Sequence, residues 1–503
     1  MKITIRSFTV AIVFASSLAL GAQSQEDTVF TDASLDFTDT SSESDALITD
    51  YTDQPEILDT SIGALEDAPV PEKKRPRSYE NANSTDTEYA KKTRDTIEFG
   101  IDSEISDLVD ELQKEDDTRF VNELYDLFQV TKSSAVREKI LSYFSKLEDP
   151  CLEDFAVETL NDPFDCPDTT VELVFNYVSA IKSEAAVQAV HNLIENENDK
   201  FFVQSIRCMG NIGNSQEAVY LSTLMDRDDL AVPQRQELIH SLGKLKANET
   251  FEKLAELAQD EDENGFIRKY SAQAIGAMEN PEAVPILVKL FEDNDPNLRV
   301  YVIKGLSYFN EPEAQRVIIQ GIRDNHYSVR LESINAVKEM NLTDAVPYLI
   351  YRAKNDSEKS VKQAVYPVIA KLNTQEGNEY LVSALEDKKL KDDTAKAKIA
   401  AALMEYNNVG TQEIIELAQS VLKDDKRKAL RYALGKEFAK YERPGYAEIC
   451  MAYLDSKDVA TQGTGLDIYA KNRFPSVTAR VEEIASQEKE SANQKKAKKI
   501  LEK

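Results

Sequence analysis

A phrase that recurs at a fixed distance constrains the fold of this chain more than any other feature. The stretch DNDPNLRVYVIKGL begins at Asp293, and DNHYSVRLESINAV begins thirty-one residues later at Asp324. Weaker copies of the phrase lie on both sides of these two, at Val136-Arg137, Arg235, Ile267-Arg268 and Val361-Lys362. The length of one repeat is 31 to 35 residues. A period in this range is typical of stacked helical hairpins, each of which cannot bury its apolar face alone. The sequence therefore predicts an all-α, right-handed solenoid of two-helix repeats.

Composition agrees with long helices, because the 503 residues include only 16 Gly and 16 Pro. Helical spacing of apolar residues begins at ISDLVDELQKEDDTRFVNELYDLF. From there about twelve hairpins are expected, at residues 103–130, 133–160, 168–195, 200–225, 231–259, 264–292, 295–322, 326–354, 357–386, 392–422, 425–454 and 457–487. The solenoid is thus predicted to span residues 100–487, followed by a basic C-terminal tail at 488–503.

The first residues have the pattern of a secretory signal peptide. Lys2 and Arg6 precede an apolar run from Phe8 to Leu20, and Gly21 and Ala22 close it. The run is shorter than the roughly 20 residues that cross a bilayer. We therefore expect residues 1–22 to be a signal peptide and the protein to be exported in a bacterium, periplasmic or secreted, and soluble after cleavage. Whether the peptide is cleaved stays open.

Charge is distributed unevenly along the chain. Residues 23–72 contain fourteen Asp or Glu and no Lys or Arg, whereas residues 388–503 contain 23 basic and 18 acidic residues. Residues 23–99 also lack helical periodicity, so they are predicted to form a disordered acidic linker. The formal charge of -30 argues against nonspecific binding to nucleic acid. The asymmetry can serve partner choice or end-to-end contact, or solubility alone.

The repeated phrase, an Asp loop followed by an apolar-Arg pair and a helix start such as NPEAVPIL, resembles the HEAT-like repeats first noted in phycobilisome lyases. The resemblance covers about residues 103 to 487. It implies a ladder of Asp and Arg side chains that joins successive repeats, because Arg can reach carboxylates and carbonyls of its own and the next loop. The matching pairs are Asp229 with Arg235, Asp262 with Arg268, Asp293 with Arg299, Asp324 with Arg330, and Asp356 with Lys362.

Lyase activity is not implied, because the repeat is an architectural unit shared by unrelated functions. The sequence indicates no catalytic residue, no cofactor and no metal site: its three histidines, His191, His240 and His326, lie in separate repeats outside any His-Glu motif. A disulfide between Cys151 and Cys166 stays open, since spacing alone does not decide its geometry.

A solenoid offers an extended surface, so binding of protein partners is the expected function. We expect the second helix of each hairpin to line the inner face, where Tyr220, Tyr348, Tyr351 and Tyr380 are candidates for partner contact. The hypothesis is a non-enzymatic exported scaffold or adaptor. Alternatives are a binder of envelope polymer or anionic lipid surfaces that uses the basic C-terminal end, and an enzyme with an unrecognised site. The partner's identity, the face used and the oligomeric state stay open.

Overall fold

A computed structural model describes residues 74–79, 87–196, 200–488 and 490–502. All of them belong to one compact unit, Pro71–Lys503. These residues form 26 α-helices and six short 3-10 helices, with no strand among them. The predicted all-α solenoid is confirmed. The predicted signal peptide, and the predicted acidic linker up to residue 73, lie outside the described residues.

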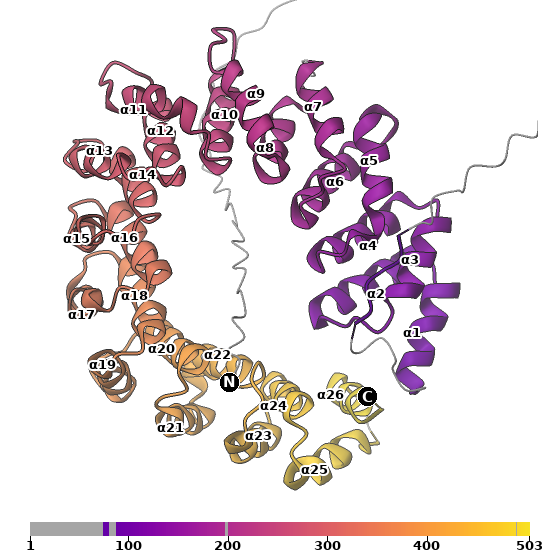
Figure 1. The fold of residues 1–503 in the computed structure, drawn as a ribbon. Coiled ribbons are helices and arrows are strands. Elements are labelled where there is room, and N and C mark those ends of the chain that lie inside the picture. Colours follow the sequence, from indigo (N-terminus) through magenta and orange to yellow (C-terminus); the bar gives the residue numbers. More distant parts are fainter. Residues whose placement is uncertain (1–73, 80–86, 197–199, 489, 503) are drawn as a thin grey trace, which may run out of the picture. The chain divides into compact units, whose positions relative to one another are not determined.

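The helices form two layers along a curved path (Figure 1). The inner layer consists of α2 (Asp102–Glu115), α4 (Ser134–Lys146), α6 (Asp168–Ile181), α8 (Phe202–Ile212), α10 (Val232–Lys244), α12 (Gly265–Ala277), α14 (Pro296–Leu306), α16 (Tyr327–Met340), α18 (Lys359–Leu372), α20 (Asp393–Tyr406), α22 (Lys428–Phe438), α24 (Val459–Asn472) and α26 (Ala492–Glu502). The outer layer consists of α1 (Glu88–Phe99), α3 (Val121–Val130), α5 (Glu153–Asn161), α7 (Val187–Glu195), α9 (Ser215–Leu224), α11 (Phe251–Gln259), α13 (Ala283–Leu290), α15 (Pro312–Gly321), α17 (Val346–Asn355), α19 (Gln375–Glu386), α21 (Thr411–Leu422), α23 (Ala447–Leu454) and α25 (Pro475–Ala485).

The 3-10 helices are short turns that precede or follow outer or inner helices. They are η1 (Pro150–Leu152), η2 (Pro163–Asp165), η3 (Asn248–Thr250), η4 (Thr343–Ala345), η5 (Asp425–Arg427) and η6 (Pro444–Tyr446). Each of the twelve hairpins expected from the sequence contains one inner helix followed by one outer helix, from α2–α3 to α24–α25. One continuous apolar core lies between the layers, from Ala90 in α1 to Ile500 in α26.

The layers are reversed relative to the sequence-based expectation, because the first helix of each hairpin lies inside. The physical reason is close packing between neighbouring inner helices. A Cβ atom added to Gly276 in α12 would stand 2.3 Å from the Cα of Gly305 in α14, and one added to Gly243 in α10 would stand 2.9 Å from the Cα of Ala274. Neighbouring helices approach more closely on the inside of a curve, so the helices with small residues at their crossings take that side.

The ordered array is longer than predicted at both ends. Residues 74–79 and α1 precede the predicted start at residue 100, and the Tyr79 hydroxyl donates a hydrogen bond of 2.7 Å to Asp149. The predicted basic tail at 488–503 contains helix α26, whose Ala497 and Ile500 are buried. The predicted boundaries at residues 100 and 487 were therefore wrong. At each end the apolar residues that form the buried face of a helix are few and lie among many charged residues, so the helical pattern is weak in the sequence.

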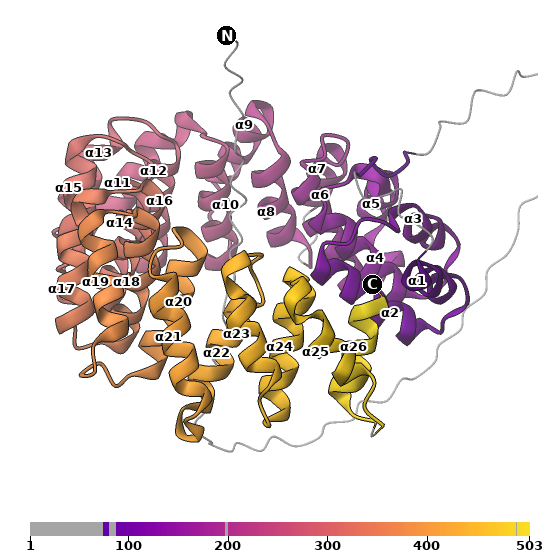
Figure 2. The ribbon, with the colours of Figure 1, turned by 90° about the horizontal axis from the view of Figure 1, so that it is seen from below.

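The last helix of this unit returns to its first helices. Lys499 Nζ in α26 lies 2.8 Å from Glu111 Oε1 in α2, although 388 residues separate them in sequence. A cavity of about 540 Å³ lies between α1, α2 and α26 and is lined by both acidic and lysine side chains. Figure 2 shows α26 beside α2 from a second direction. Attraction between the acidic first helices and the basic last helix accounts for this contact.

Carbodiimide coupling tests this contact, because the reagent joins an amine to a carboxylate only when the two touch. We expect mass spectrometry of the monomeric protein to find a crosslink between Lys499 and Glu111. The yield should fall in 1 M salt, where the Debye length is about 3 Å. The variant Lys499→Gln should lose this product and keep the local crosslink between Lys495 and Glu490, whose charged atoms lie 3.0 Å apart. A Lys499–Glu111 product found only in covalent dimers would contradict an intramolecular contact.

Candidate binding face

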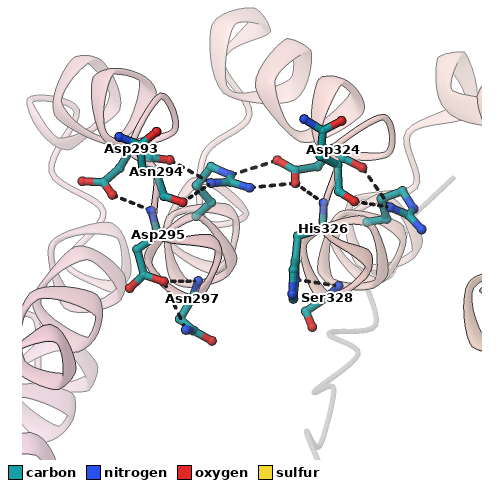
Figure 3. Close-up of polar contacts among 10 residues, drawn as sticks. Asp293, Asn294, Asp295, Asn297, Asp324, His326 and Ser328 are labelled. Atoms are coloured by element: carbon teal, nitrogen blue, oxygen red, sulfur yellow. Dashed lines mark hydrogen bonds and ion pairs between the residues drawn. The ribbon is translucent and has the colours of Figure 1, made fainter.

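The loops that precede inner helices are joined by arginine side chains (Figure 3). Arg299, in the first turn of α14, donates through Nη1 to the carbonyl oxygens of Asp293 (2.8 Å) and Asn294 (3.1 Å) in its own loop. Its Nε and Nη2 donate to the two carboxylate oxygens of Asp324 in the next loop, at 2.9 and 2.8 Å. One guanidinium therefore joins two successive repeats with four hydrogen bonds.

The next repeat has the same arrangement in a more buried setting. Arg330 donates through Nη1 to the carbonyls of Asp324 (2.9 Å) and Asn325 (3.0 Å) and through Nη2 to Asp356 Oδ1 (2.8 Å). The side chains of Arg330 and Asp356 are 6% and 0% exposed. Each carboxylate also holds its own turn: Asp324 Oδ1 accepts the backbone N–H of His326 at 2.7 Å, and Asp293 Oδ1 that of Asp295 at 2.8 Å (Figure 3).

The structure brings together only part of the expected ladder. Arg268 reaches Asp293 of the following loop at 3.0 Å, so three consecutive rungs start at Arg268, Arg299 and Arg330. Asp229 pairs with Arg227 (2.6 Å) instead of a ladder residue. Within the described part of the chain, Arg235, Asp262 and Lys362 form no ion pair. Each of these three rungs joins an Arg to the Asp of the next repeat, 25 or 26 residues further along the chain. The Asp that lies six residues before each Arg is in the Arg's own repeat and is not its ion-pair partner.

Aromatic and basic side chains gather on the solvent-facing side of two inner helices. This group, called the inner-face cluster here, consists of Phe266, Lys269 and Tyr270 of α12 and Tyr301 and Lys304 of α14. The Tyr270 and Tyr301 rings pack edge to face with centroids 5.0 Å apart. Lys269 Nζ lies 4.1 Å from the centroid of the Phe266 ring, and Lys304 Nζ lies 4.6 Å from that of Tyr301. Phe266 is 54% exposed, so the cluster presents apolar surface to solvent.

Burial changes the protonation of groups in and beside the inner-face cluster. It raises the pKa of the Tyr301 hydroxyl and of the Glu332 carboxyl in α16, and it lowers the pKa of the Lys269 ammonium. In α10, burial lowers the pKa of His240 to about 4, and Lys244 and Lys304 lower it further while Glu237 opposes them. Burial therefore disfavours the charged forms of these groups, so a bound partner would meet a partly desolvated surface.

Sequence reasoning did not find the inner-face cluster. The available signal was the repetition of aromatic and Lys residues at positions 270 and 301, and 269 and 304, on consecutive first helices. The sequence-based expectation placed the second helix of each hairpin on the inner face, so residues of the first helices were not candidates for partner contact.

The four tyrosines selected from the sequence lie on outer helices and do not form one site. Tyr220 in α9 packs on His191, with ring centroids 4.1 Å apart. Tyr380 in α19 is half-buried beneath Lys354. Tyr348 and Tyr351 in α17 are 40% and 58% exposed, and Tyr348 lines an open groove of about 830 Å³ on the outer layer.

Neither metal-binding nor membrane-spanning features are found in the described residues. No group of three or more His, Cys, Asp or Glu side chains there is arranged to hold a metal ion. None of the helices described is both long enough and apolar enough to span a bilayer. Cys151 and Cys166 are unpaired in the structure, and burial raises the pKa of the Cys151 thiol.

Solved structures similar to this chain are helical-repeat proteins. One is the complex of CpcE and CpcF of phycocyanin lyase from Nostoc sp. PCC7120, with 16% sequence identity and a TM-score of 0.28. The aligned region covers 50% of this chain and 93% of that chain. Human deoxyhypusine hydroxylase is 15% identical over 51% of this chain and 96% of that chain, with a TM-score of 0.24. Kap95p, in a structure with RanGDP, is 13% identical over 84% of this chain and 60% of that chain, with a TM-score of 0.40. Identities this low concern the fold alone.

Two further comparisons complete these findings. No functionally curated protein matches the sequence. The family described as "Spirochaete HEAT repeat protein" matches residues 97–500.

Removing one partner of the buried rung should destabilise the array. Arg330→Ala leaves the Asp356 carboxylate buried with only Arg352 nearby, at 3.5 Å, so we expect a loss of about 3–5 kcal/mol in the free energy of unfolding. Arg330→Lys keeps the charge but not the planar fork, and should lose less. Arg316→Ala is the matched control, since Arg316 and Glu313 are 70% and 51% exposed and their pair contributes less than about 1 kcal/mol. Urea unfolding measures all three. Equal losses for Arg330→Ala and Arg316→Ala would contradict a structural role for the rung.

The low pKa of His240 predicts a specific dependence of stability on pH. Its ordinary value is about 6.5, whereas the folded value is about 4. Between these values the unfolded chain binds a proton that the folded chain excludes. The free energy of unfolding therefore falls as pH falls through this window, by at most about 3 kcal/mol from this residue.

The variant His240→Gln isolates this contribution from the many carboxylates that titrate nearby. Urea unfolding of both proteins at pH 7, 5.5 and 4.5 should show a smaller acid loss in the variant. Parallel curves for the two proteins would contradict a neutral, buried His240.

Proposed function

The chain belongs to the spirochaete HEAT repeat proteins, and from this premise we propose that it is a non-enzymatic scaffold that binds other proteins through its inner face. The proposal includes export to the periplasm or cell exterior, which the pattern of residues 1–22 supports. Stacked repeats of this kind present extended concave surfaces on which several repeats contact one partner.

The inner-face cluster is the observation that carries the proposal. Exposed Phe and Tyr side chains supply most of the binding energy in protein interfaces, because they bury a large rigid apolar area. Here they stand beside Lys269 and Lys304, whose ammonium groups lie over the rings. Such a surface fits a partner that combines apolar and acidic side chains. The rings come from two repeats that the Arg268–Asp293 rung holds at a fixed spacing, so the surface is preorganised.

Support for the rival function, binding of envelope polymer or anionic lipid by the C-terminal end, is weaker. Three of the four lysines of α26 form ion pairs within the protein: Lys495 with Glu490 (3.0 Å), Lys496 with Asp467 (2.7 Å) and Lys499 with Glu111 (2.8 Å). Binding to an anionic surface would have to compete with these ion pairs. The enzyme alternative has no arrangement of reactive groups in its favour among the described residues.

Crosslinking in living cells tests the scaffold proposal. We expect the triple variant Phe266→Ala, Tyr270→Ala, Tyr301→Ala to capture its protein partner at least tenfold less than wild type, because loss of a few aromatic anchors costs about 2 kcal/mol or more each. The double variant Tyr348→Ala, Tyr351→Ala is the matched control from the outer layer and should retain the partner. A second variant, Lys269→Glu with Lys304→Glu, keeps the rings and should also lose it.

The choice of the inner face would be contradicted if the outer-layer variant lost the protein partner while both inner-face variants kept it. Capture on anionic vesicles that disappears in Lys498→Gln, with no protein partner recovered, would favour the lipid-surface alternative instead.

A further inference from the structure

The ladder of arginine rungs is interrupted at Lys362 in α18. Arg299 and Arg330 occupy the equivalent position in the two preceding repeats, and both bind carbonyls of their own loop and the next Asp. Lys362 has a single ammonium in place of the guanidinium fork, and within the described residues it has neither contact. In the following repeat, Lys396 donates to the carbonyls of Leu385 (2.6 Å) and Asp387 (3.1 Å) and is buried. The loop before α20 is thus held by Lys396 from its own side, and α18 contributes the partly exposed ion pair of Lys359 with Asp392 instead of an arginine rung.

A cavity of about 460 Å³ lies where the rung is missing. Its walls come from α17, α18, α19, the loop before α20 and the first turn of α20, so it lies across three successive hairpins. The lining includes four lysines: Lys354, Lys359, Lys362 and Lys389. Only two acidic residues line it, Asp387 and Asp392.

Both of these aspartates are already engaged by the loop. Asp392 caps α20, accepting the backbone N–H of Thr394 at 2.9 Å, and pairs with Lys359 at 3.1 Å. Asp387 accepts the backbone N–H of Lys389 at 2.7 Å. The ammonium groups of Lys354, Lys362 and Lys389 have no ion-pair partner in the part of the chain that the structure describes. With four lysines and two aspartates, the lining of the cavity has a net charge of +2 in an acidic protein.

The tyrosines of the cavity add a polar group and aromatic surface to its lining. Tyr366 of α18 is 3% exposed as a whole residue and lines the cavity, and its hydroxyl forms no hydrogen bond with any described residue. The hydroxyl atom itself is accessible from the cavity, so it can donate to a group that occupies that space. Tyr380 lies on the opposite wall, with Lys354 Nζ 5.1 Å from its ring centroid. The hydroxyl of Tyr366 and the nearby ammonium groups converge on the same space.

We propose that this cavity binds the carboxylate side chains of an acidic segment of a partner protein, with Lys354, Lys362 and Lys389 as ion-pair partners and the Tyr366 hydroxyl as a hydrogen-bond donor. Three lysines contributed by α17, α18 and the loop before α20 fit several carboxylates on one chain better than one compact anion, which is best held by a guanidinium fork or converging backbone N–H groups. The inference rests on the proposed scaffold function and adds a second contact point for the same acidic partner class.

Fluorescence anisotropy with a labelled, capped hexaglutamate tests the site, with hexaglutamine as the uncharged probe. The mature chain should bind hexaglutamate and not hexaglutamine. Lys354→Gln and Lys362→Gln should each weaken binding at least fivefold, and Tyr366→Phe about threefold, since each removes one hydrogen-bond donor to a charged group. Lys398→Gln, an exposed lysine of α20 outside the cavity, is the matched control and should change affinity less than twofold. Circular dichroism confirms folding, and Lys354 is exposed, so its variant keeps the fold.

The proposal would be overturned if wild type failed to bind hexaglutamate, or if binding were unchanged in both lysine variants. Displacement by inorganic phosphate at equal charge concentration would also overturn it, because the site would then bind a free anion. Failure here is distinguishable from failure of the scaffold proposal. The Phe266, Tyr270, Tyr301 triple variant should bind hexaglutamate as wild type does, so loss of peptide binding in that variant alone would assign the acidic segment to the inner face and reject the cavity.

Discussion

The contact between an arginine and the aspartate of the next repeat is the constraint on which the central repeats depend. The guanidinium satisfies two carbonyls of its own loop and a carboxylate of the following one, so a single side chain sets the distance between neighbouring inner helices. Since the Arg330–Asp356 pair is almost fully buried, its geometry is specified tightly: a misplaced partner would leave a charge without compensation. The rungs lie in the loops, which leaves the solvent-facing sides of the helices free to contact other molecules.

Packing of the inner layer determines how this spacing becomes curvature. Gly276 and Gly305 allow α12 and α14 to cross closely on the inner side. Repeating a small rotation from one hairpin to the next brings α26 back to α2, where Lys499 meets Glu111. The uneven charge of the chain therefore has a structural consequence in this unit: its basic last helix forms an ion pair with its acidic first helices.

Both proposed binding surfaces lie where the chain departs from the regular repeat. Where the ladder is regular, its arginines and aspartates pair with one another across successive repeats. At Lys362 the rung is absent, and lysines and the Tyr366 hydroxyl remain unsatisfied around a cavity. The inner-face cluster is a different kind of departure, because Phe266 exposes apolar area on a helix that is otherwise polar outside its core face. Functional residues commonly break the local rules that the rest of a fold obeys.

The amino-acid sequence by itself determined the all-α repeat architecture, because each hairpin forms from local helical periodicity and capping that recur every 31 to 35 residues. It also identified Arg299, Asp324 and Arg330 as special positions. Only the tertiary structure decided which helix layer lies inside, which of the expected rungs form, and that α1 and α26 belong to the array. The reason is physical: these features depend on the packing distance between hairpins and on contacts between residues up to 388 positions apart, which a local pattern does not encode.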